Sequence, residues 1–499
     1  PAALHPVKQG ADAGTGMIRL DSVSYAYPHT GKPALEDLTL SIGKGQCVMI
    51  TGPSGAGKTT LCLASAGILA HEYGGKKVGT VTIDGRDVKS YKDLSDIASN
   101  LGIVFDDPEA QLIFTTVEEE ILSALERRGL TVDEIEDRLR VIMEMTKLTT
   151  LKERAPHTLS GGQKQRLVLA VTLALGTGIL ILDEPTSELD EHGTDGILEI
   201  LKGLKAQGKT ILLVEHKFLR MREIVDILVV MEGGSIRAAG TPDEVIRDPG
   251  VQKIVVPDFS GIRERTRSIG ETFVPVSLVQ VTGLSHTYGG DIHALYDIDL
   301  TISSGEFIAI VGENGSGKTT LIKHFNGLLK ATGGSVSVKG KDASRTTITE
   351  LSRDVGLVFQ NPDHMFFADT VRDEVAFGVD NLGIPDRDVV IDHALTRVRL
   401  THAKDLYPRW LSRGERQRLA IACVLAMKPA VIVLDEPTTG LDGKEAREVM
   451  EVLKELQLAG HTVIIVTHSR EIARDCADRV ITMEMGRIIS DVQMSGGRK

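Results

Sequence analysis

Two copies of one glycine-rich stretch constrain this chain more than any other feature of its sequence. Residues 312–320 read Gly-Glu-Asn-Gly-Ser-Gly-Lys-Thr-Thr and follow an apolar run at 307–311. Residues 52–60 read Gly-Pro-Ser-Gly-Ala-Gly-Lys-Thr-Thr and follow an apolar run at 47–50. Both match G-x-x-x-x-G-K-T, the spacing of a P-loop. Each copy predicts a strand, a glycine loop and a helix in succession, so the chain carries the same phosphate-binding machinery twice.

The residue types of a P-loop follow from its chemistry. Glycines let successive backbone N–H groups point at phosphate oxygens, and the helix N-terminus adds its positive end. The lysine can reach the β- and γ-phosphates, and the threonine hydroxyl after it can bind Mg²⁺. A chance glycine turn is the alternative, but the flanking segments fit the motif. The candidate nucleotide ligands are Gly52, Ser54, Gly55, Gly57, Lys58, Thr59 and Thr60, and Gly312, Asn314, Gly315, Gly317, Lys318, Thr319 and Thr320.

The internal repeat predicts two large domains in a chain of 499 residues. Strands that alternate with helical patterns, with a P-loop after the first core strand, predict an α/β core with a largely parallel sheet. We expect the domains at 17–247 and 276–492, a linker at 248–275 where Pro and Gly bracket a charged run, and tails at 1–16 and 493–499. Segments 18–27 and 34–42 are expected to be edge strands.

Composition excludes some functions. The chain has 57 basic and 69 acidic residues, a formal charge of −12, which argues against a nucleic-acid partner. The longest uncharged run, 167–182, contains two glycines and falls short of the roughly 18 apolar residues of a membrane span. The four cysteines form no C-x-x-C pair, so we expect them to be small buried side chains rather than metal ligands.

An acidic pair follows a buried strand in each half. Strand 179–182 runs into Asp183 and Glu184, and the corresponding apolar run in the second half leads into Asp435 and Glu436. Ligands bind at the C-terminal edge of a parallel sheet. The first carboxylate would hold Mg²⁺, directly or through water, and the second would polarise the attacking water. The alternative is that Asp-Glu-Pro-Thr only ends a strand and begins a turn.

The stretch Leu159-Ser160-Gly161-Gly162-Gln163 lies between a P-loop and an acidic strand end, and it resembles the signature motif of ABC-type ATPases. The resemblance covers 18–246 and 276–489. It implies an antiparallel β subdomain and a helical signature subdomain beside each core, and two domains that close head to tail. Each ATP would then lie between the P-loop of one domain and the signature of the other. Hydrolysis would remove this bridge and open the pair.

The resemblance also implies roles for further residues. The aromatic residue before each P-loop would stack on adenine, and a histidine after a later strand would contact the γ-phosphate and help to orient water. A core aromatic and an ordinary polar histidine are the respective alternatives. These residues are Tyr27 and Tyr288, His216 and His468, and the signatures Ser160, Gly161, Gly162 and Gln163, and Ser412, Arg413, Gly414 and Glu415.

The two halves differ at the positions that the family uses. Gln360 stands where the family has a metal- and nucleotide-contacting glutamine, but Asp106 replaces it in the first half. The second signature has Arg413 for the first Gly and Glu415 for Gln, and the latter change is tolerated in many ABC proteins. Both departures would meet at the composite site that contains Lys58. We therefore expect one consensus site and one altered site.

The neighbourhood of Gln360 narrows the resemblance further. Residues 359–367 and 370–378, and again 107–114 and 116–121, are similar to the ATPases of energy-coupling factor importers. In that family this segment receives the coupling helices of a transmembrane subunit, and a groove for an amphipathic helix needs apolar residues. The alternative is that the apolar side chains pack within the helical arm. Those side chains are Ile113, Phe114, Phe366 and Phe367.

This resemblance implies ATP and Mg²⁺ as cofactors, a transmembrane coupling subunit and a substrate-binding membrane subunit as partners, and a peripheral place on the cytoplasmic face of the membrane. The transported class would be a vitamin, or cobalt or nickel ions. One alternative is the fused ATPase of a sugar importer. Another is a soluble translation factor with twin ABC domains, although such proteins have a long charged helical linker and this linker is short and broken by Pro and Gly.

Overall fold

The computed structural model describes residues 16–28, 32–187, 189–264, 275–289 and 292–494. The chain forms two compact units, Pro1–Val256 and Pro257–Lys499, here called unit 1 and unit 2. Most of the two expected tails, 1–15 and 495–499, lies outside the described residues. Both units have the α/β architecture that the repeat predicts, and each is described by itself.

Unit 1 is built from two sheets and a set of helices. Its strands are β1 (Gly16–Ala26), β2 (Leu35–Gly43), β3 (Cys47–Thr51), β4 (Lys76–Ile83), β5 (Arg86–Asp87), β6 (Leu101–Val104), β7 (Ile179–Asp183), β8 (Thr210–Val214), β9 (Ile227–Glu232) and β10 (Ser235–Gly240). Its helices are α1 (Lys58–Ser65), α2 (Ile68–His71), α3 (Leu94–Ala98), α4 (Val117–Glu126), α5 (Val132–Met145), α6 (Gly161–Ala174), α7 (Glu191–Ala206), α8 (Phe218–Met221), α9 (Pro242–Val245) and α10 (Pro249–Val255).

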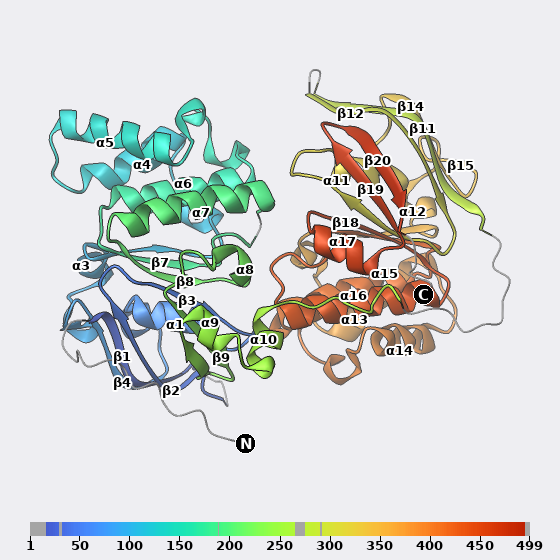
Figure 1. Ribbon diagram of the computed structural model, residues 1–499. Coiled ribbons are helices and arrows are strands. Elements are labelled where there is room, and N and C mark those ends of the chain that lie inside the picture. The colour runs from blue at the N-terminus through green and yellow to red at the C-terminus, as the bar shows by residue number, and fades with distance from the viewer. Residues whose placement is uncertain (1–15, 29–31, 188, 265–274, 290–291, 495–499) are drawn as a thin grey trace. The chain divides into compact units, whose positions relative to one another are not determined.

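The central sheet of unit 1 has the order β10-β9-β3-β8-β7-β6. Strands β9, β3, β8, β7 and β6 pair in parallel, and β10 joins antiparallel to β9. A second, antiparallel sheet has the order β2-β1-β4-β5. In Figure 1 the helices α4, α5 and α6 lie on one side of the central sheet, and the antiparallel sheet and α1 lie on the other. Strand β7 is buried along its whole length, as a strand covered on both faces must be.

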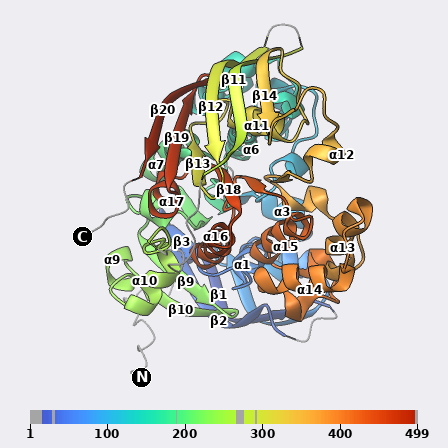
Figure 2. The same ribbon diagram turned by 90° about the vertical axis from the view of Figure 1, so that its right-hand side faces the viewer.

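Unit 2 repeats this plan. Its strands are β11 (Ser277–Tyr288), β12 (Ile292–Ser303), β13 (Phe307–Val311), β14 (Gly333–Val338), β15 (Lys341–Asp342), β16 (Val355–Val358), β17 (Val431–Asp435), β18 (Thr462–Thr467), β19 (Arg479–Glu484) and β20 (Arg487–Gln493). Its helices are α11 (Lys318–Phe325), α12 (Ile348–Leu351), α13 (Val371–Leu382), α14 (Arg387–Arg397), α15 (Arg413–Ala426), α16 (Gly443–Leu458) and α17 (Arg470–Cys476). The sheet orders are β12-β11-β14-β15 and β16-β17-β18-β13-β19-β20. Figure 2 shows α13, α14 and α15 gathered at the end of the unit away from β11, β12 and β14.

The expectation of an edge strand at 18–27 is wrong. Strand β1 pairs antiparallel with β2 on one side and with β4 on the other, so it lies inside the sheet. Strands β2 and β5 are the two edge strands of this sheet, and the edge position of β2 agrees with the expectation for 34–42. The alternation of buried Ile18 and Leu20 with exposed Arg19 reports one buried face, and it says nothing of how many neighbours a strand has.

Part of the expected linker belongs to the two units. Asp248 caps α10 by accepting hydrogen bonds from the backbone of Gly250 and Val251, and Pro249 takes the first helical position, where proline is favoured. The proline that suggested a break thus begins a helix, which packs in the core of unit 1. Beyond it, Phe259 and Ile262 are buried in the core of unit 2. Residues 265–274 lie outside the described residues.

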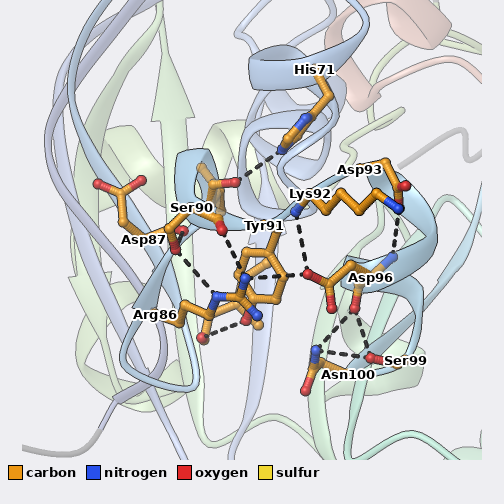
Figure 3. A network of polar contacts seen from close by, with 12 residues as sticks. His71, Arg86, Asp87, Ser90, Tyr91, Lys92, Asp93, Asp96, Ser99 and Asn100 are labelled. Carbon is orange, nitrogen blue, oxygen red and sulfur yellow. Dashed lines mark hydrogen bonds and ion pairs between the residues drawn. The ribbon is translucent and has the colours of Figure 1, made fainter.

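A polar network fixes the segment between the antiparallel sheet of unit 1 and β6 (Figure 3). The Arg86 guanidinium lies 4.0 Å from the centroid of the Tyr91 ring and forms an ion pair with Asp96 at 3.2 Å. Asp93 caps α3 by accepting from the backbone of Asp96 at 3.0 Å. These contacts set where β6 begins, and β6 leads directly to Asp106.

A buried carboxylate joins the two sheets of unit 2. Asp354, just before β16, forms ion pairs with Lys339 at 2.9 Å and Lys341 at 2.6 Å, which stand at the β14–β15 turn. Burial alone would raise the pKa of Asp354, but hydrogen bonds from Lys341 and Lys339 hold it below its ordinary value. The ionised carboxylate therefore stabilises the folded protein above about pH 4. This contribution is lost as the pH falls further and Asp354 becomes protonated.

Replacing Asp354 by Asn is expected to lower the free energy of unfolding at pH 7 by about 1–2 kcal/mol, because it removes charge from two hydrogen bonds to lysine. Urea unfolding followed by circular dichroism measures the change. The difference between the two proteins should narrow as the pH falls below about 4, where the native carboxylate also becomes protonated. Equal urea midpoints at pH 7 would disprove a stabilising role for this carboxylate.

Candidate active site

Each P-loop connects a central strand to a helix through glycines with backbone conformations that disfavour other residues. Gly52 has φ 147° and Gly312 has φ 157°, and an added Cβ would lie 2.2 Å from the carbonyl oxygen of Met231 or 2.3 Å from that of Met483. Gly57 and Gly317 stand before α1 and α11 in the left-handed region. Only glycine allows this path at low cost.

The P-loop lysines are buried and lie over their own loops. Lys58 Nζ donates to the carbonyl oxygens of Gly52 and Pro53, each at 3.0 Å. Lys318 Nζ donates to Gly312 and Glu313, each at 2.8 Å. The ammonium groups therefore stand inside the loop, at the place where a phosphate bound by the loop N–H groups would need them.

The acidic strand ends meet the P-loop helices. Thr319 Oγ1 donates to Asp435 Oδ2 at 2.7 Å, and the second oxygen of each strand-end aspartate, Asp183 Oδ1 and Asp435 Oδ1, is buried with no hydrogen-bond partner among the described residues. Burial raises the pKa of Asp435 and, with the neighbouring charge of Glu184, raises the pKa of Asp183 to about 7. Such a buried oxygen beside a threonine hydroxyl fits Mg²⁺, an oxygen-seeking cation that keeps several waters.

The structure brings together the glutamate and histidine of each unit, which the sequence had assigned separately. His216 Nε2 lies 3.0 Å from Glu184 Oε1, and His468 Nδ1 lies 2.9 Å from Glu436 Oε2. Both glutamates have positive φ, 49° and 48°, a conformation that costs energy for a residue with a side chain. Strain at the same place in both units is typical of a functional site.

The expected adenine-stacking tyrosines contact the P-loop helices. Tyr27 OH lies 3.2 Å from Thr60 Oγ1, and Tyr288 OH lies 3.2 Å from Thr320 Oγ1. Each ring also stands edge-on to an aromatic neighbour, Tyr25 or His286. The structure thus places both tyrosines beside the nucleotide loop and leaves their stacking role a prediction.

Both signature motifs begin a helix with the same cap. Ser160 and Ser412 are the N-caps of α6 and α15, and each accepts a hydrogen bond from the backbone of the residue three places on. The side chains of Gln163 and Glu415 bond back to the serine backbone at 3.0 and 2.9 Å. Glutamate and glutamine complete this capping box equally well, so Glu415 does not disturb the second motif.

Two other differences between the halves, Asp106 in place of Gln and Arg413 in place of Gly, change the charge near the candidate sites. Partial desolvation, followed by the charge of Glu184, raises the pKa of Asp106, which places it near the acidic strand end of unit 1. Asp106 and its counterpart Gln360 are both exposed, and each stands two residues after its strand, β6 or β16. The Arg413 guanidinium packs on Gly440, where an added Cβ would lie 2.3 Å from its central carbon.

The structure also assigns roles that the sequence analysis missed. Lys217 Nζ donates to the carbonyl oxygens of Thr186 and Leu189, at 2.7 and 2.9 Å, and holds the turn after β7, of which residue 188 lies outside the described residues. Glu445 bonds Ser412 of the second signature. Glu445 replaces a glycine of the first half, and comparing the halves at an offset of 252 could have found it.

In fold and in the layout of its site, each unit is a P-loop domain in which a glutamate at a strand end lies within 3.0 Å of a histidine. The family model described as "ABC transporter" matches residues 35–187 and 295–439. The chain belongs to the ABC transporter family, as an ATP-binding protein with two ATPase domains. Among the described residues, no helix is long and apolar enough to cross a membrane.

Relatives match along almost the whole chain. A provisionally named ABC transporter ATP-binding protein of Methanosarcina mazei is 48% identical over 481 residues, 95% of each chain. One from Caldanaerobacter subterraneus subsp. tengcongensis is 38% identical over 503 residues, covering 91% of this chain and 87% of its own. Among solved structures, CbiO1 of Clostridium perfringens, described as part of an ABC transporter complex, is 40% identical over 44% of this chain and 88% of its own, with a TM-score of 0.42.

Proposed function

We propose that this ATPase is the duplicated motor subunit of an energy-coupling factor importer for vitamins or for cobalt or nickel ions. It would bind peripherally at the cytoplasmic face of the membrane to a transmembrane coupling subunit, which works with a separate substrate-binding membrane subunit. The proposal depends on two exposed apolar loops, one at 366–368 after Gln360 and one at 113–114 after Asp106. In each loop the backbone N–H groups donate hydrogen bonds to a buried glutamate.

In both loops a glutamate fixes the backbone, while apolar side chains are exposed to solvent. Glu120 of α4, which is 3% exposed, accepts hydrogen bonds from the backbone of Ile113 and Phe114. Glu374 of α13 accepts from the backbone of Phe367 at 2.9 Å and of Ala368 at 2.8 Å. A rigid backbone that presents apolar side chains loses little entropy when an amphipathic helix docks on it.

Three apolar side chains on these loops are exposed, and the fourth is buried. Ile113 is 83% exposed, Phe114 44% and Phe367 64%. Phe367 stands edge-to-face with exposed Phe377 at 4.6 Å between ring centroids. Phe366 is buried in the core of unit 2. Packing inside the domain therefore explains the apolar character of Phe366, but not that of the three exposed side chains.

In the proposed reaction, ATP is hydrolysed in two composite sites that form when a P-loop of one domain meets a signature of another. The P-loop N–H groups and Lys318 would bind the phosphates, and Thr319 and Asp435 would hold Mg²⁺, which would supply positive charge to neutralise the phosphates. Glu436 accepts a proton from the attacking water, and His468 holds the Glu436 carboxylate in place.

The site that combines Lys58, Asp183 and Glu184 with the second signature would be the altered one. Two charged residues that the other site lacks support this proposal. Asp106 adds a carboxylate beside Glu184, where the other half has neutral Gln360. Arg413 adds a guanidinium at the second signature where the first has glycine. We propose that this site hydrolyses ATP slowly and that the consensus site sets the rate of turnover.

Docking is tested by replacing Phe367 with Ser, alone and together with Ile113→Ser. Both side chains are exposed, so folding and ATP binding should be preserved. We expect the single change to reduce the amount of membrane protein that co-purifies with the tagged chain by about tenfold, because truncation of an apolar anchor costs about 1–2 kcal/mol. The double change should abolish co-purification.

The matched control is Val389→Ser, which removes a side chain that is 70% exposed on α14, a helix that is part of neither loop. It should leave co-purification unchanged. Retention of the membrane protein by the double variant would refute the proposed docking surface. Salt-sensitive co-sedimentation with ribosomes, and no membrane partner, would instead favour a twin-ABC translation factor.

A further inference from the structure

The second signature motif is occupied by a carboxylate of its own unit. Ser412 Oγ donates to Glu445 Oε1 at 2.8 Å, and the backbone N of Gly414 donates to the same oxygen at 3.3 Å. Glu445 stands in the first turn of α16, whose N-cap Asp442 accepts a hydrogen bond from the Glu445 backbone at 2.8 Å. The carboxylate therefore reaches the N-terminus of α15 from a rigid neighbouring helix.

The signature is shaped to admit this carboxylate. An added Cβ on Gly414 would lie 2.7–2.8 Å from the carbon atoms of the Glu445 side chain, so only glycine leaves the side chain this path. Helix α15 has 14 residues, and its positive N-terminal end favours an anion at this place. The Ser412 hydroxyl and a backbone N–H of the first turn are satisfied by one charged oxygen.

In the first half, the position that corresponds to Glu445 has no carboxylate that could bond the signature motif. Gly193 stands in α7 where Glu445 stands in α16, and its backbone N likewise donates to the N-cap Asp190, at 2.7 Å. The Ser160 hydroxyl accepts from the backbone N of Gln163 at 3.4 Å. The two helices thus begin in the same way, and the difference is one side chain.

We infer that Glu445 is a resident anion which holds the second signature in place of the γ-phosphate and must leave before Ser412 can bind nucleotide. The inference rests on the proposed composite sites. The donors that Glu445 occupies are those that would face the γ-phosphate, and one hydroxyl cannot donate to both. If the carboxylate stayed, its charge would repel the phosphate. Glu445 therefore determines which of the two sites binds ATP tightly.

Nucleotide affinity tests this directly. In a Lys318→Ala background, which disables the consensus P-loop, binding of Mg²⁺ with a non-hydrolysable ATP analogue reports the altered site. Glu445→Gly, which installs the residue of the first half, should tighten binding by about tenfold, because a charge-assisted hydrogen bond no longer competes. Glu445→Ala, which avoids a helical glycine, should do the same. Unchanged or weaker binding in both variants would overturn the inference.

A purely structural capping role is separated by Glu445→Gln. Its amide oxygen can still accept from Ser412 and Gly414, so a structural role predicts the behaviour of the native protein. Competition between anions predicts binding that is tighter than native, by about three- to fivefold, because the charge is gone. The affinity therefore distinguishes the two roles even if all variants fold equally well.

The reciprocal exchange places the carboxylate in unit 1. In a Lys58→Ala background, Gly193→Glu should weaken binding at the consensus site by about tenfold, whereas Gly193→Gln should weaken it much less. Glutamate is favoured over glycine in a first helical turn, so unfolding is not the expected cause. If no variant or parent binds nucleotide, the proposed function fails. If nucleotide binds and neither exchange shifts the affinity, only the role of Glu445 fails.

Discussion

Replacing Glu436 by Gln is expected to lower the steady-state ATPase rate by about 10²–10³, while Glu184→Gln lowers it by no more than about twofold. A general base contributes on the order of 10²–10⁴ to a rate, and Gln keeps the shape of the side chain but cannot accept the proton. Both glutamates contact a histidine at about the same distance, 2.9 and 3.0 Å. The unequal outcome would therefore come from the surroundings of the pair, not from the pair itself.

The measurement is phosphate release at saturating ATP by each variant in the full chain, reconstituted with its membrane partner. Binding of a fluorescent ATP analogue serves as the control, because both variants should keep nucleotide affinity. The double variant should turn over more slowly than Glu436→Gln, because it also loses the slow hydrolysis at the altered site. Equal losses in the two single variants would show two equivalent sites and would remove the case for Asp106 and Arg413.

Replacing Lys318 by Ala is expected to weaken ATP binding at its own site by about 10²-fold and to remove nearly all turnover. Each hydrogen bond from a charged donor contributes about 1.5–3 kcal/mol, and the lysine would exchange its present bonds to Gly312 and Glu313 for bonds to phosphate. Lys58→Ala provides the matched variant. It should lose affinity at the other site by a similar factor but retain most of the turnover.

Equilibrium dialysis with labelled ATP resolves the two sites, because Lys318→Ala should keep only the weaker, altered site and Lys58→Ala only the tighter, consensus site. The native protein should bind two nucleotides with unequal affinities. Circular dichroism without nucleotide checks that the loop still folds when the carbonyl oxygens of Gly312 and Glu313 lose their donor. Two undisturbed sites in the Lys318→Ala protein would mean that the P-loop does not bind phosphate as proposed.

Much of this protein follows from local sequence patterns. The P-loops, the acidic strand ends and the signature serines were predicted at the residues where the structure places them, because each depends on a few neighbouring residues. Glycines with positive φ at 52 and 312 are demanded by the loop itself. The capping boxes at Ser160 and Ser412 are likewise set within four residues.

Contacts between distant segments were beyond the sequence patterns. The order of the chain does not show that β1 pairs on both sides, nor that Glu436 and His468 lie 2.9 Å apart. Burial of Phe259 and Ile262 was also missed, because a Pro- and Gly-rich segment reads as linker whether or not a neighbouring core receives its apolar side chains.

The sequence by itself determined that two ATPase domains are present and which side chains form their P-loops and acidic strand ends, because these properties depend on short motifs with fixed spacing. Only the tertiary structure decided what each motif contacts. Ser160 and Ser412 begin their helices alike, yet a glutamate 33 residues further on reaches Ser412, and glycine stands at the matching place after Ser160. That contact depends on how two helices pack, and packing is a property of the whole unit.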